Sequence, residues 1–543
     1  MRNTAIVSSL AGLLLTATTL LPQASMAAAL PPQNAMGGAK VVIYPAPAGE
    51  ALSNAYKLQV GGRDVPVYLL RVSPQDKTLR LNSVDDKSQY GLKYEEAAFA
   101  YFDADGMVDM TVTFDGPVSA ARLLPISPAI PVSIQGNTIR FRANSPQNLT
   151  LEVNHQLVRT LHIFMNPVET GAPSPKDANV VYLAPGTHQM SSFKMPPDKS
   201  ILYFGPGIHM IDNLALSDGQ MVYIAGGAVV RSTIRETEPF VTDTLAGQSS
   251  KVYTKPAISI YGARIKIRGR GILDGLAAPG KRLLSIEGQD IGLYDVILRY
   301  SGNWFMPIFF SDRVEVSNLK ILSYRANSDG IDIYSSRDVS VQGCFIRTVD
   351  DVITVKSKSK TPNVVTETDK VNRVTVSGNR LWNETGTAMV IGTAVGADIS
   401  GVTFSNNDVI HDLARGASEG INLAGSGTVS NIRFENNRID RSSNQIDAPG
   451  ASRVIYVYIQ HSQWEAAADK SKPLGKVRDI LFSNTQIALP PQDPKIRIDL
   501  EGASDQSNIE GVRFENITVN GKPLTKADTL VNEKFASKIA GLP

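Results

Sequence analysis

The chain has 543 residues, of which 42% are hydrophobic and 20% are charged, and its 54 Lys and Arg nearly balance its 52 Asp and Glu, for a net charge of +2. This balance argues against a nucleic-acid-binding protein and against a protein held at a membrane surface by basic residues. The length suffices for more than one domain or for one long repetitive domain.

Residues 1–29 have the pattern of a secretory signal peptide. Arg2 precedes a mostly apolar stretch, and the small residues ASMAAA follow it, so we expect cleavage after Ala27 or Ala29. The alternative is a membrane anchor, for which the apolar stretch is short and interrupted by Ser and Thr. We therefore expect a bacterial protein that is secreted or periplasmic. The single cysteine, Cys344, lies in the apolar run VSVQGCFI and is expected to be a buried thiol.

The next part of the chain is predicted to be a linker followed by a β-sandwich. Residues 30–50 are rich in Pro, Ala and Gly, as linkers often are. From 51 to 172, short alternating stretches such as YKLQV, MVDMTVTF and NTIRFRA are separated by Gly, Asn, Asp and Pro. This pattern is typical of an N-terminal β-sandwich domain, with LHIFMNPVE as its last strand.

Residues 176–522 have a repeated pattern of a different kind. Units such as IKIRGRGI, IGLYDVIL, VEVSNLKI and VSVQGCFI recur at spacings of about 23–26 residues, and similar units continue to VRFENITV with longer insertions. Repeats of this length, made of strands and Asn or Gly turns, predict a parallel β-helix of stacked coils. A β-propeller or a second sandwich is the alternative, but these units are too short for four-stranded blades. Residues 523–543 are predicted to be a C-terminal tail. The predicted fold class is therefore all-β.

Three carboxylates gather in the middle of this region, in the run NSDGIDIYSSRDVSVQGCFIRTVDDVITVKS. Asp329 and Asp351 are 351 − 329 = 22 residues apart, about one coil, so aligning Ile331 with Ile353 places the two aspartates side by side. Asp350 projects from the adjacent position. Like charges at this spacing do not all ionise near neutral pH, and a partly protonated cluster suits acid/base hydrolysis of a glycosidic bond. The alternative is that these aspartates only form turns.

The stretch from Asn303 to Lys356 resembles glycoside hydrolase family 28, the polygalacturonases, and the related family 49, which includes dextranases and isopullulanase. The resemblance rests on NWFMPIFFSDRVEVSNL, NSDGID and VDDVITVKS. It implies a right-handed parallel β-helix enzyme that acts with inversion, with Asp351 as the general acid and with Asp329 and Asp350 holding the attacking water. One-coil stacking by itself favours a shorter separation than the roughly 6.5–9.5 Å of inverting enzymes.

The chain departs from the polygalacturonases at two of their motifs. Thr387 and Ala388 stand where that family has the histidine and second glycine of Gly-His-Gly. Asn422 and Ala424 stand where it has the two cations of Arg-Ile-Lys, which grip the substrate carboxylate. Without those charge-assisted bonds a neutral glycan becomes the expected substrate. Family 49 also lacks both motifs and pairs a sandwich with a β-helix, so the resemblance implies a dextran-like α-glucan and an endo-α-1,6-glucanase-like activity.

Further side chains are candidates for substrate binding around the three aspartates. They are Asn327, Trp304, Lys356, Thr387, Glu384 and His411. Packing or a solvated loop is the alternative for each of them, and Trp382 is an equivalent aromatic candidate. No metal site and no cofactor are predicted, because no His, Cys and Asp cluster has metal-ligand spacing and no Gly-rich phosphate loop opens a helix. The expected partner is a polysaccharide substrate, with no nucleic acid and no membrane, and the protein is expected to be a monomer.

Other functions stay open at this point. The protein could be a polygalacturonase with an unusual carboxylate-binding set, a polysaccharide lyase of the same fold, or a non-catalytic glycan-binding β-helix. The sequence does not separate endo from exo action, because that depends on how loops close the ends of the cleft.

Overall fold

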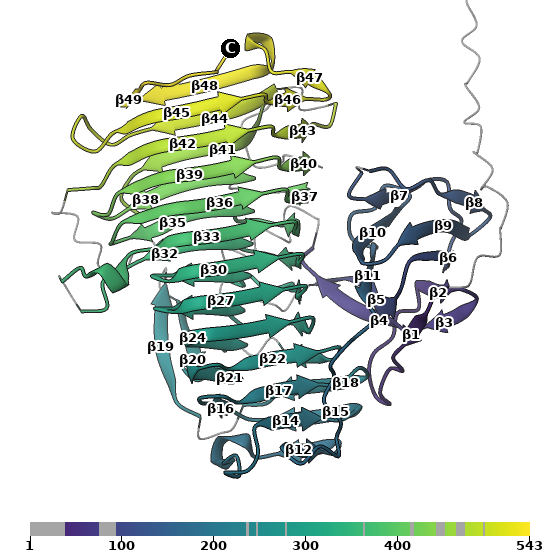
Figure 1. The fold of residues 1–543 in the computed structure, drawn as a ribbon. Coiled ribbons are helices and arrows are strands. Elements are labelled where there is room, and N and C mark those ends of the chain that lie inside the picture. Colours follow the sequence, from purple (N-terminus) through teal and green to yellow (C-terminus); the bar gives the residue numbers. More distant parts are fainter. Residues whose placement is uncertain are drawn as a thin grey trace, which may run out of the picture. The chain divides into compact units, whose positions relative to one another are not determined.

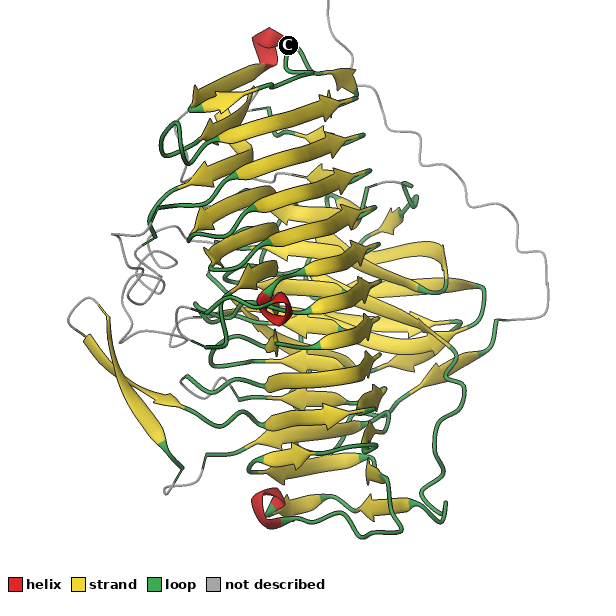
Figure 2. Ribbon diagram, turned by 60° about the vertical axis from the view of Figure 1, so that its left-hand side comes forward, coloured by secondary structure: helices red, strands yellow, loops and turns green. Residues whose placement is uncertain are grey.

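The structure is a computed structural model that describes residues 39–74, 94–126, 128–234, 238–245, 248–276, 280–361, 364–412, 417–440, 451–462, 473–491 and 495–543. The predicted signal peptide lies outside these residues. Within them the regular structure is almost entirely strand (Figure 2), with three short 3₁₀ helices, η2 (Met190–Ser192), η3 (Glu367–Asp369) and η4 (Lys526–Asp528). None of the described helices has the length and hydropathy that a membrane span requires.

The N-terminal domain is built from two mainly antiparallel sheets. The first contains β1 (Val41–Ile43), β4 (Val67–Val72), β5 (Glu95–Ala104), β7 (Ala121–Leu124), β10 (Gln147–Val153) and β11 (Leu161–Pro167). The second contains β2 (Tyr56–Val60), β3 (Arg63–Val65), β6 (Met107–Phe114), β8 (Ser133–Gln135) and β9 (Thr138–Asn144). Alternate residues of strands such as β2 are buried in a core shared by both sheets, which makes the domain a β-sandwich. Because β1 pairs with β5, this part of the predicted linker belongs to the sandwich.

The rest of the described chain winds into a parallel β-helix, as the repeats predicted (Figure 1). Its 23-stranded sheet supplies two walls of the coils. The strands of this sheet are β12 (Val180–Leu183), β14 (Ile201–Phe204), β16 (Leu214–Leu216), β17 (Met221–Ile224), β21 (Ile258–Ala263), β22 (Lys266–Gly269), β24 (Leu284–Tyr294), β26 (Met306–Phe309), β27 (Asp312–Ser317), β29 (Ile331–Tyr334), β30 (Arg337–Gln342), β32 (Ile353–Ser357), β33 (Asn372–Ser377), β35 (Met389–Val395), β36 (Ile399–Ser405), β38 (Glu419–Ala424), β39 (Val429–Glu435), β41 (Ala451–Ile459), β42 (Val477–Ser483), β44 (Lys495–Glu501), β45 (Ile509–Glu515), β48 (Thr529–Lys534) and β49 (Ala536–Ser537).

The remaining wall of the β-helix is a 13-stranded sheet. Its strands are β13 (Gly186–His188), β15 (Gly207–Ile211), β18 (Ala228–Ser232), β23 (Ile272–Asp274), β25 (Ile297–Arg299), β28 (Lys320–Leu322), β31 (Phe345–Thr348), β34 (Arg380–Asn383), β37 (Asp408–Asp412), β40 (Arg438–Asp440), β43 (Gln486–Ala488), β46 (Thr518–Val519) and β47 (Lys522–Pro523). A separate antiparallel hairpin, β19 (Phe240–Leu245) and β20 (Gln248–Tyr253), is inserted before β21.

The predicted repeat units stack in register. Val314 pairs with Val339, Val339 with Val374, and Val374 with Val402, and the same inward position continues to Val512. Each of these side chains is nearly fully buried, so every coil completes the core of the coils next to it. The ring centres of four successive phenylalanines in the last coils are 4.9–5.2 Å apart, close to the spacing of the strands themselves.

The Asn residues of the repeats have a structural reason. Asn406, Asn436 and Asn484 have φ between 52° and 58°, a conformation that Asn tolerates better than most residues. The next residues, Asn407 and Asn437, form a buried ladder with Asn379 of the preceding coil. Asn379 Nδ2 donates to Asn407 Oδ1 at 2.9 Å, and Asn407 Nδ2 donates to Asn437 Oδ1 at 3.2 Å. The buried amide groups at these turns therefore find hydrogen-bond partners in the neighbouring coils.

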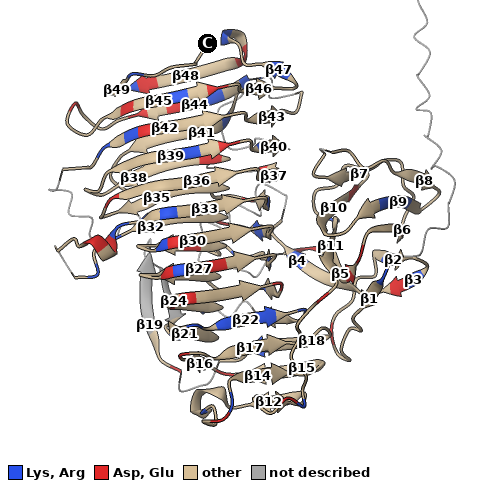
Figure 3. Cartoon of the chain, in the orientation of Figure 1, with Lys and Arg blue, Asp and Glu red and all other residues tan. Residues whose placement is uncertain are grey.

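The predicted C-terminal tail contributes strands to the last coil. β48 pairs with β44, and β49 pairs with β45. The solenoid therefore extends beyond residue 522, the predicted end of the β-helix. Lys and Arg positions and Asp and Glu positions are both spread over many strands of the β-helix (Figure 3), and pairs such as Arg313 and Asp290, 2.6 Å apart, neutralise one another.

Candidate active site

Asp329 and Asp351 lie on neighbouring coils of the β-helix. Ile331 pairs with Ile353, as the sequence predicted, and the N–H of Gly330 donates to the carbonyl of Asp351 at 2.9 Å. The two aspartates immediately precede β29 and β32, where the chain turns into the sheet. The 22-residue spacing therefore brings these two side chains to the same place on one wall.

Glycines allow the coils to approach closely at these turns. A Cβ on Gly330 would lie 2.4 Å from the carbonyl oxygen of Val352, and a Cβ on Gly386 would lie 2.4 Å from the backbone nitrogen of Asp351. Neither position has room for a side chain unless the backbone moves. Gly386 thereby packs the next coil directly against the Asp350–Asp351 turn.

The two adjacent aspartates are held by backbone donors. Asp350 Oδ1 accepts a hydrogen bond from the N–H of Asp351 at 3.0 Å, and Asp351 Oδ1 accepts one from the N–H of Thr387 at 2.8 Å. The hydroxyl of Thr348 donates to the Asp350 carbonyl at 2.9 Å. Because Oδ1 of Asp351 is an acceptor, a proton on this carboxyl sits on Oδ2.

The electrostatics of the cluster favour partial protonation. Burial, together with the nearby charge of Asp332, raises the pKa of Asp329 well above its usual range. Burial and the charge of Asp350 raise the pKa of Asp351 to about 7. These carboxyls interact, so their protons are lost in steps that belong to the cluster as a whole. At least one acid proton is therefore available at neutral pH.

Asp332 is a fourth carboxylate of the cluster, which the sequence analysis missed. It points outward from β29, three residues after Asp329, and its side chain is fully buried. The ammonium of Lys356 lies 2.7 Å from Asp332 Oδ1 and 3.3 Å from Asp329 Oδ2. The pattern IDIY, with its polar residue at an outward strand position, was the available signal. The predicted residue Lys356 thus lies at the aspartates.

Trp304 also lies at the cluster, against two cations. Lys356 Nζ is 4.2 Å from the centre of its ring, and the guanidinium of Arg282 is 5.3 Å away. The charge of Arg282 also acts on Asp332 and Asp329. Asn327 lies in the turn that leads to Asp329, is exposed and has a φ of 57°.

Thr387, which stands in place of the family 28 histidine, is connected to a residue that the sequence analysis did not consider. Its hydroxyl is 3.0 Å from the hydroxyl of Tyr456, which comes from β41, two coils further on. The Tyr456 ring crosses the intervening coil at Gly420, where a Cβ would lie 2.5 Å from the ring. Burial and the charge of Asp351 raise the pKa of Tyr456, so its phenol stays protonated. The alternation of Tyr456 and Tyr458 in β41 was the signal for an outward aromatic row.

Glu384 and His411 do not lie at the aspartates, and their predicted role in substrate binding is wrong. Both are fully buried on the 13-stranded wall. Glu384 Oε1 is 2.8 Å from Arg347 Nη2, and His411 Nε2 is hydrogen-bonded to Glu152 of the sandwich strand β10. Trp382 is buried beside them, 3.9 Å from the Arg347 guanidinium. The sandwich covers this wall, which removes these side chains from solvent.

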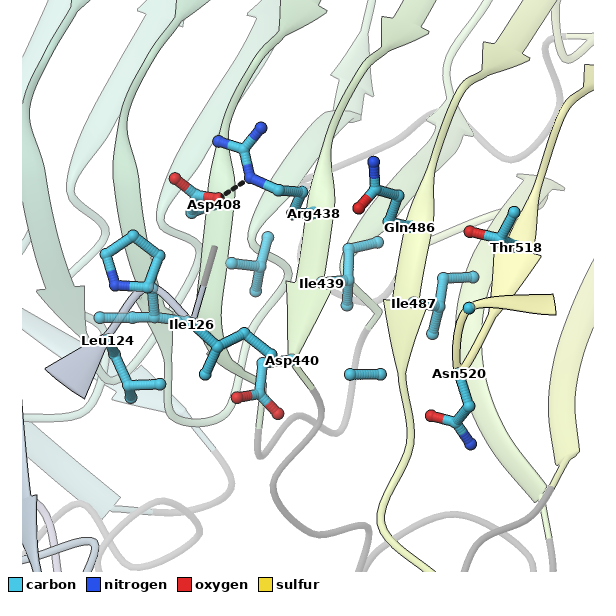
Figure 4. A pocket seen from close by; sticks show the side chains of 15 residues that line it. Leu124, Ile126, Asp408, Arg438, Ile439, Asp440, Gln486, Ile487, Thr518 and Asn520 are labelled. Atoms are coloured by element: carbon cyan, nitrogen blue, oxygen red, sulfur yellow. Dashed lines mark hydrogen bonds and ion pairs between the residues drawn. The ribbon is translucent and has the colours of Figure 1, made fainter. Parts of the chain in front are cut away.

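A cavity of about 300 Å³ lies elsewhere, along strands β37, β40, β43 and β46 (Figure 4). Its walls are mostly aliphatic, with Ile439 and Ile487 at the centre and Leu124 and Ile126 from the sandwich. Its buried carboxylate Asp408 is paired with Arg438 and Arg380. Its second carboxylate, Asp440, lies 3.7 Å from Arg122, and burial raises its pKa. The cavity thus holds two separate carboxylates, each beside an arginine, whereas four gather around Lys356 at the aspartate cluster.

Comparisons with known proteins bear on the β-helix as a whole. Residues 283–536 match the model of glycosyl hydrolases family 28, and this range contains all four aspartates. The chain carries a glycoside hydrolase domain. It resembles the β-helix enzymes of families 28 and 49, as the motifs predicted.

Solved structures share the fold of this glycoside hydrolase at low sequence identity. Dex49A from Penicillium minioluteum is 16% identical, with a TM-score of 0.56 over 91% of this chain and 96% of that one. Because the β-helix begins only at β12, that likeness extends into the sandwich. A polygalacturonase from Erwinia carotovora ssp. carotovora is also 16% identical, with a TM-score of 0.51 over 67% of this chain and 99% of that one. No curated protein matches the chain in sequence.

Proposed function

We propose that this polysaccharide hydrolase cleaves a neutral, dextran-like glycan by single displacement with inversion, outside the bacterial cytoplasm. The observation that carries the proposal is the placement of Asp329 beside Asp351, with the pKa of Asp351 raised to about 7. A carboxyl that is still protonated near neutral pH suits a general acid, and neighbouring carboxylates suit the activation of water.

In the proposed reaction, Asp351 donates the proton on Oδ2 to the glycosidic oxygen while the bond from that oxygen to the anomeric carbon breaks. A water held by Asp329 and Asp350 attacks the anomeric carbon and gives its proton to whichever of these two carboxyls is ionised while Asp351 carries the acid proton. A new C–O bond replaces the broken one, and the two carboxyls exchange protons with solvent before the next cycle. Thr387 N–H keeps Oδ1 occupied and so directs the acid proton to Oδ2.

The charges around the cluster support a neutral substrate. Asn422 accepts a hydrogen bond from Gln460 and Ala424 is buried, so neither supplies the cation found there in polygalacturonases. Lys356 is engaged by Asp329 and Asp332. Internal pairing of this kind leaves less positive charge for an acidic sugar.

A polygalacturonase is the second candidate, and one observation favours it. Arg453 lies on β41 with its guanidinium 5.7 Å from the centre of the Tyr456 ring, and Tyr456 contacts Thr387 beside Asp351. Its Nη1 donates to the hydroxyl of Tyr458 at 3.2 Å and lies 4.0 Å from Asp499 Oδ2. A cation at this place could replace those missing at Asn422 and Ala424.

The test is a panel of polysaccharides that includes dextran and polygalacturonate, with reducing sugars measured and the anomer of the first product followed by NMR. We expect release from dextran with inverted configuration and at least a 10²-fold loss in Asp351→Asn. Release from polygalacturonate alone would favour the second candidate. An unsaturated product absorbing in the ultraviolet would favour a lyase, and glycan binding without any product would favour a binding protein.

A further inference from the structure

Lys356 is the most deeply placed cation of the site. It extends outward from β32, yet its side chain is only 8% exposed. Its ammonium contacts Asp332 at 2.7 Å, Asp329 at 3.3 Å and the face of Trp304 at 4.2 Å. A buried ammonium loses its hydration and is retained only when carboxylates or aromatic faces replace that hydration.

Asp332 is suited to be the counter-ion of this lysine and is poorly suited to contact a substrate. Its side chain is fully buried. One of its oxygens binds Lys356, and the other has no hydrogen-bond partner among the described residues. Its charge therefore acts on the groups around it and reaches no sugar directly.

We propose that Lys356 is a positioning residue for Asp329, the carboxylate proposed to activate water, and that Asp332 is the buried counter-ion that holds Lys356 in place. This inference rests on the proposed hydrolytic function. Lys356 spans two coils, from β32 back to the turn before β29, and its contact with Oδ2 fixes the orientation of the Asp329 carboxylate. The same contact favours the ionised form of that carboxylate.

Other charged groups face the pair from every neighbouring element. Asp350 and Asp351 come from the turn before β32, Arg282 from the turn before β24, and Tyr456 reaches Asp351 from β41. Among these influences, Asp332 raises the pKa of Asp329 and Lys356 lowers it. Removing the lysine and removing the counter-ion should therefore shift the titration of Asp329 in opposite directions.

The experiment compares the pH dependence of kcat/KM for Lys356→Met, Lys356→Arg and Asp332→Asn on the polysaccharide that the wild type cleaves. For Lys356→Met we expect the acidic limb to move up by about one pH unit or more, because an opposite charge within about 4–6 Å is lost. For Asp332→Asn we expect that limb to move down, because Lys356 then pairs with Asp329 alone. Lys356→Arg should keep the limb near its wild-type position.

Lys358→Met is the matched control. Lys358 follows β32, is exposed and lies 5.1 Å from the centre of the Tyr334 ring, so its removal should leave the limb unchanged. Equal losses of kcat at every pH in Lys356→Met and Asp332→Asn, with no shift of the limb, would overturn the inference and leave these residues a purely structural role.

A second readout does not depend on turnover. Carboxyl ¹³C NMR of aspartate-labelled protein follows the titration of Asp329, with its signal assigned through Asp329→Asn. An upward shift of that titration in Lys356→Met supports the inference, and an unchanged titration contradicts it. If the wild type released no sugar from any polysaccharide, the proposed function would fail, and the NMR titration would still decide the role of Lys356.

Discussion

Two walls of the same coils carry buried charges, and they use them differently. On the 13-stranded wall, Arg347 is bonded to Glu384, and Glu152 of the sandwich bonds His411. On the aspartate wall, four carboxylates face Lys356 and Arg282. Balanced charge under a covering domain stabilises the docking of that domain. An excess of carboxylates raises pKa values and prepares a site for proton transfer.

The largest predicted difference between the two walls is in how a substitution changes protein stability. Glu384→Gln leaves the fully buried Arg347 without its carboxylate, so we expect the free energy of unfolding to fall by about 3–5 kcal/mol. The kcat of the folded enzyme should stay within about twofold of wild type, because the pair lies away from the aspartates. Denaturant unfolding and initial rates check the two parts. A tenfold loss of kcat in fully folded protein would place Glu384 in the catalytic machinery and break the comparison.

The next largest effect is a loss of kcat caused by a displacement of the backbone at the aspartates. Gly386→Ala puts a Cβ 2.4 Å from the Asp351 nitrogen, so the Asp350–Asp351 turn has to move. A displacement of about 1 Å at reacting groups costs about 10²-fold in rate, and we expect kcat to fall by that factor. Gly116→Ala is the control, because the nearest atom to its Cβ is an ordinary 3.6 Å contact in the sandwich. Unchanged kcat in folded Gly386→Ala would contradict the assignment of this turn to the site.

A smaller loss is expected at the hydroxyl pair beside Asp351. Thr387→Val and Tyr456→Phe each remove one hydroxyl of the 3.0 Å contact while the backbone N–H of Thr387 stays on Asp351. The loss of one hydrogen bond is worth about 0.5–1.5 kcal/mol, so we expect kcat/KM to fall about 2- to 12-fold. The double variant should lose little more than either single one, since both remove the same bond. Full additivity would show that the hydroxyls act separately.

The remaining effect is a gain in stability that depends on pH. The pKa of Asp351 in the folded protein, about 7, lies above its ordinary value near 4, so its contribution to stability is fully present below about pH 4 and is lost as pH rises through 7. Asp351→Asn cannot ionise. We therefore expect its Tm to exceed that of the wild type at pH 8, with the difference vanishing near pH 4. A constant difference across this range would contradict the raised pKa.

Much of the fold was predictable because it follows from the regular spacing of apolar residues along the chain. The apolar positions of units such as VEVSNLKI and VSVQGCFI predicted coils that stack in register, and Val314 does pair with Val339. The boundaries were less predictable. β1 lies in the predicted linker and β48 in the predicted tail, because strand pairing with distant partners outweighs the composition of both segments.

The candidate site was predictable for residues at or just before the stacked strands that carry the aspartate motif. Asp329, Asp351, Lys356 and Thr387 lie together because each is fixed by the register of β29, β32 and β35. Glu384 and His411 are as near to the motif in sequence, yet they lie on another wall. Tyr456 is far along the chain and reaches the site only because Gly420 leaves space for its ring.

The sequence by itself determined the coil repeat, the pairing of Asp329 with Asp351 and the resemblance to β-helix glycoside hydrolases, because all three depend on short-range spacing. Only the tertiary structure decided which wall the sandwich covers and which charges balance. That outcome depends on where the sandwich strand β10 docks and on contacts such as Lys356 with Asp332, where burial and pairing set the energy of each charge.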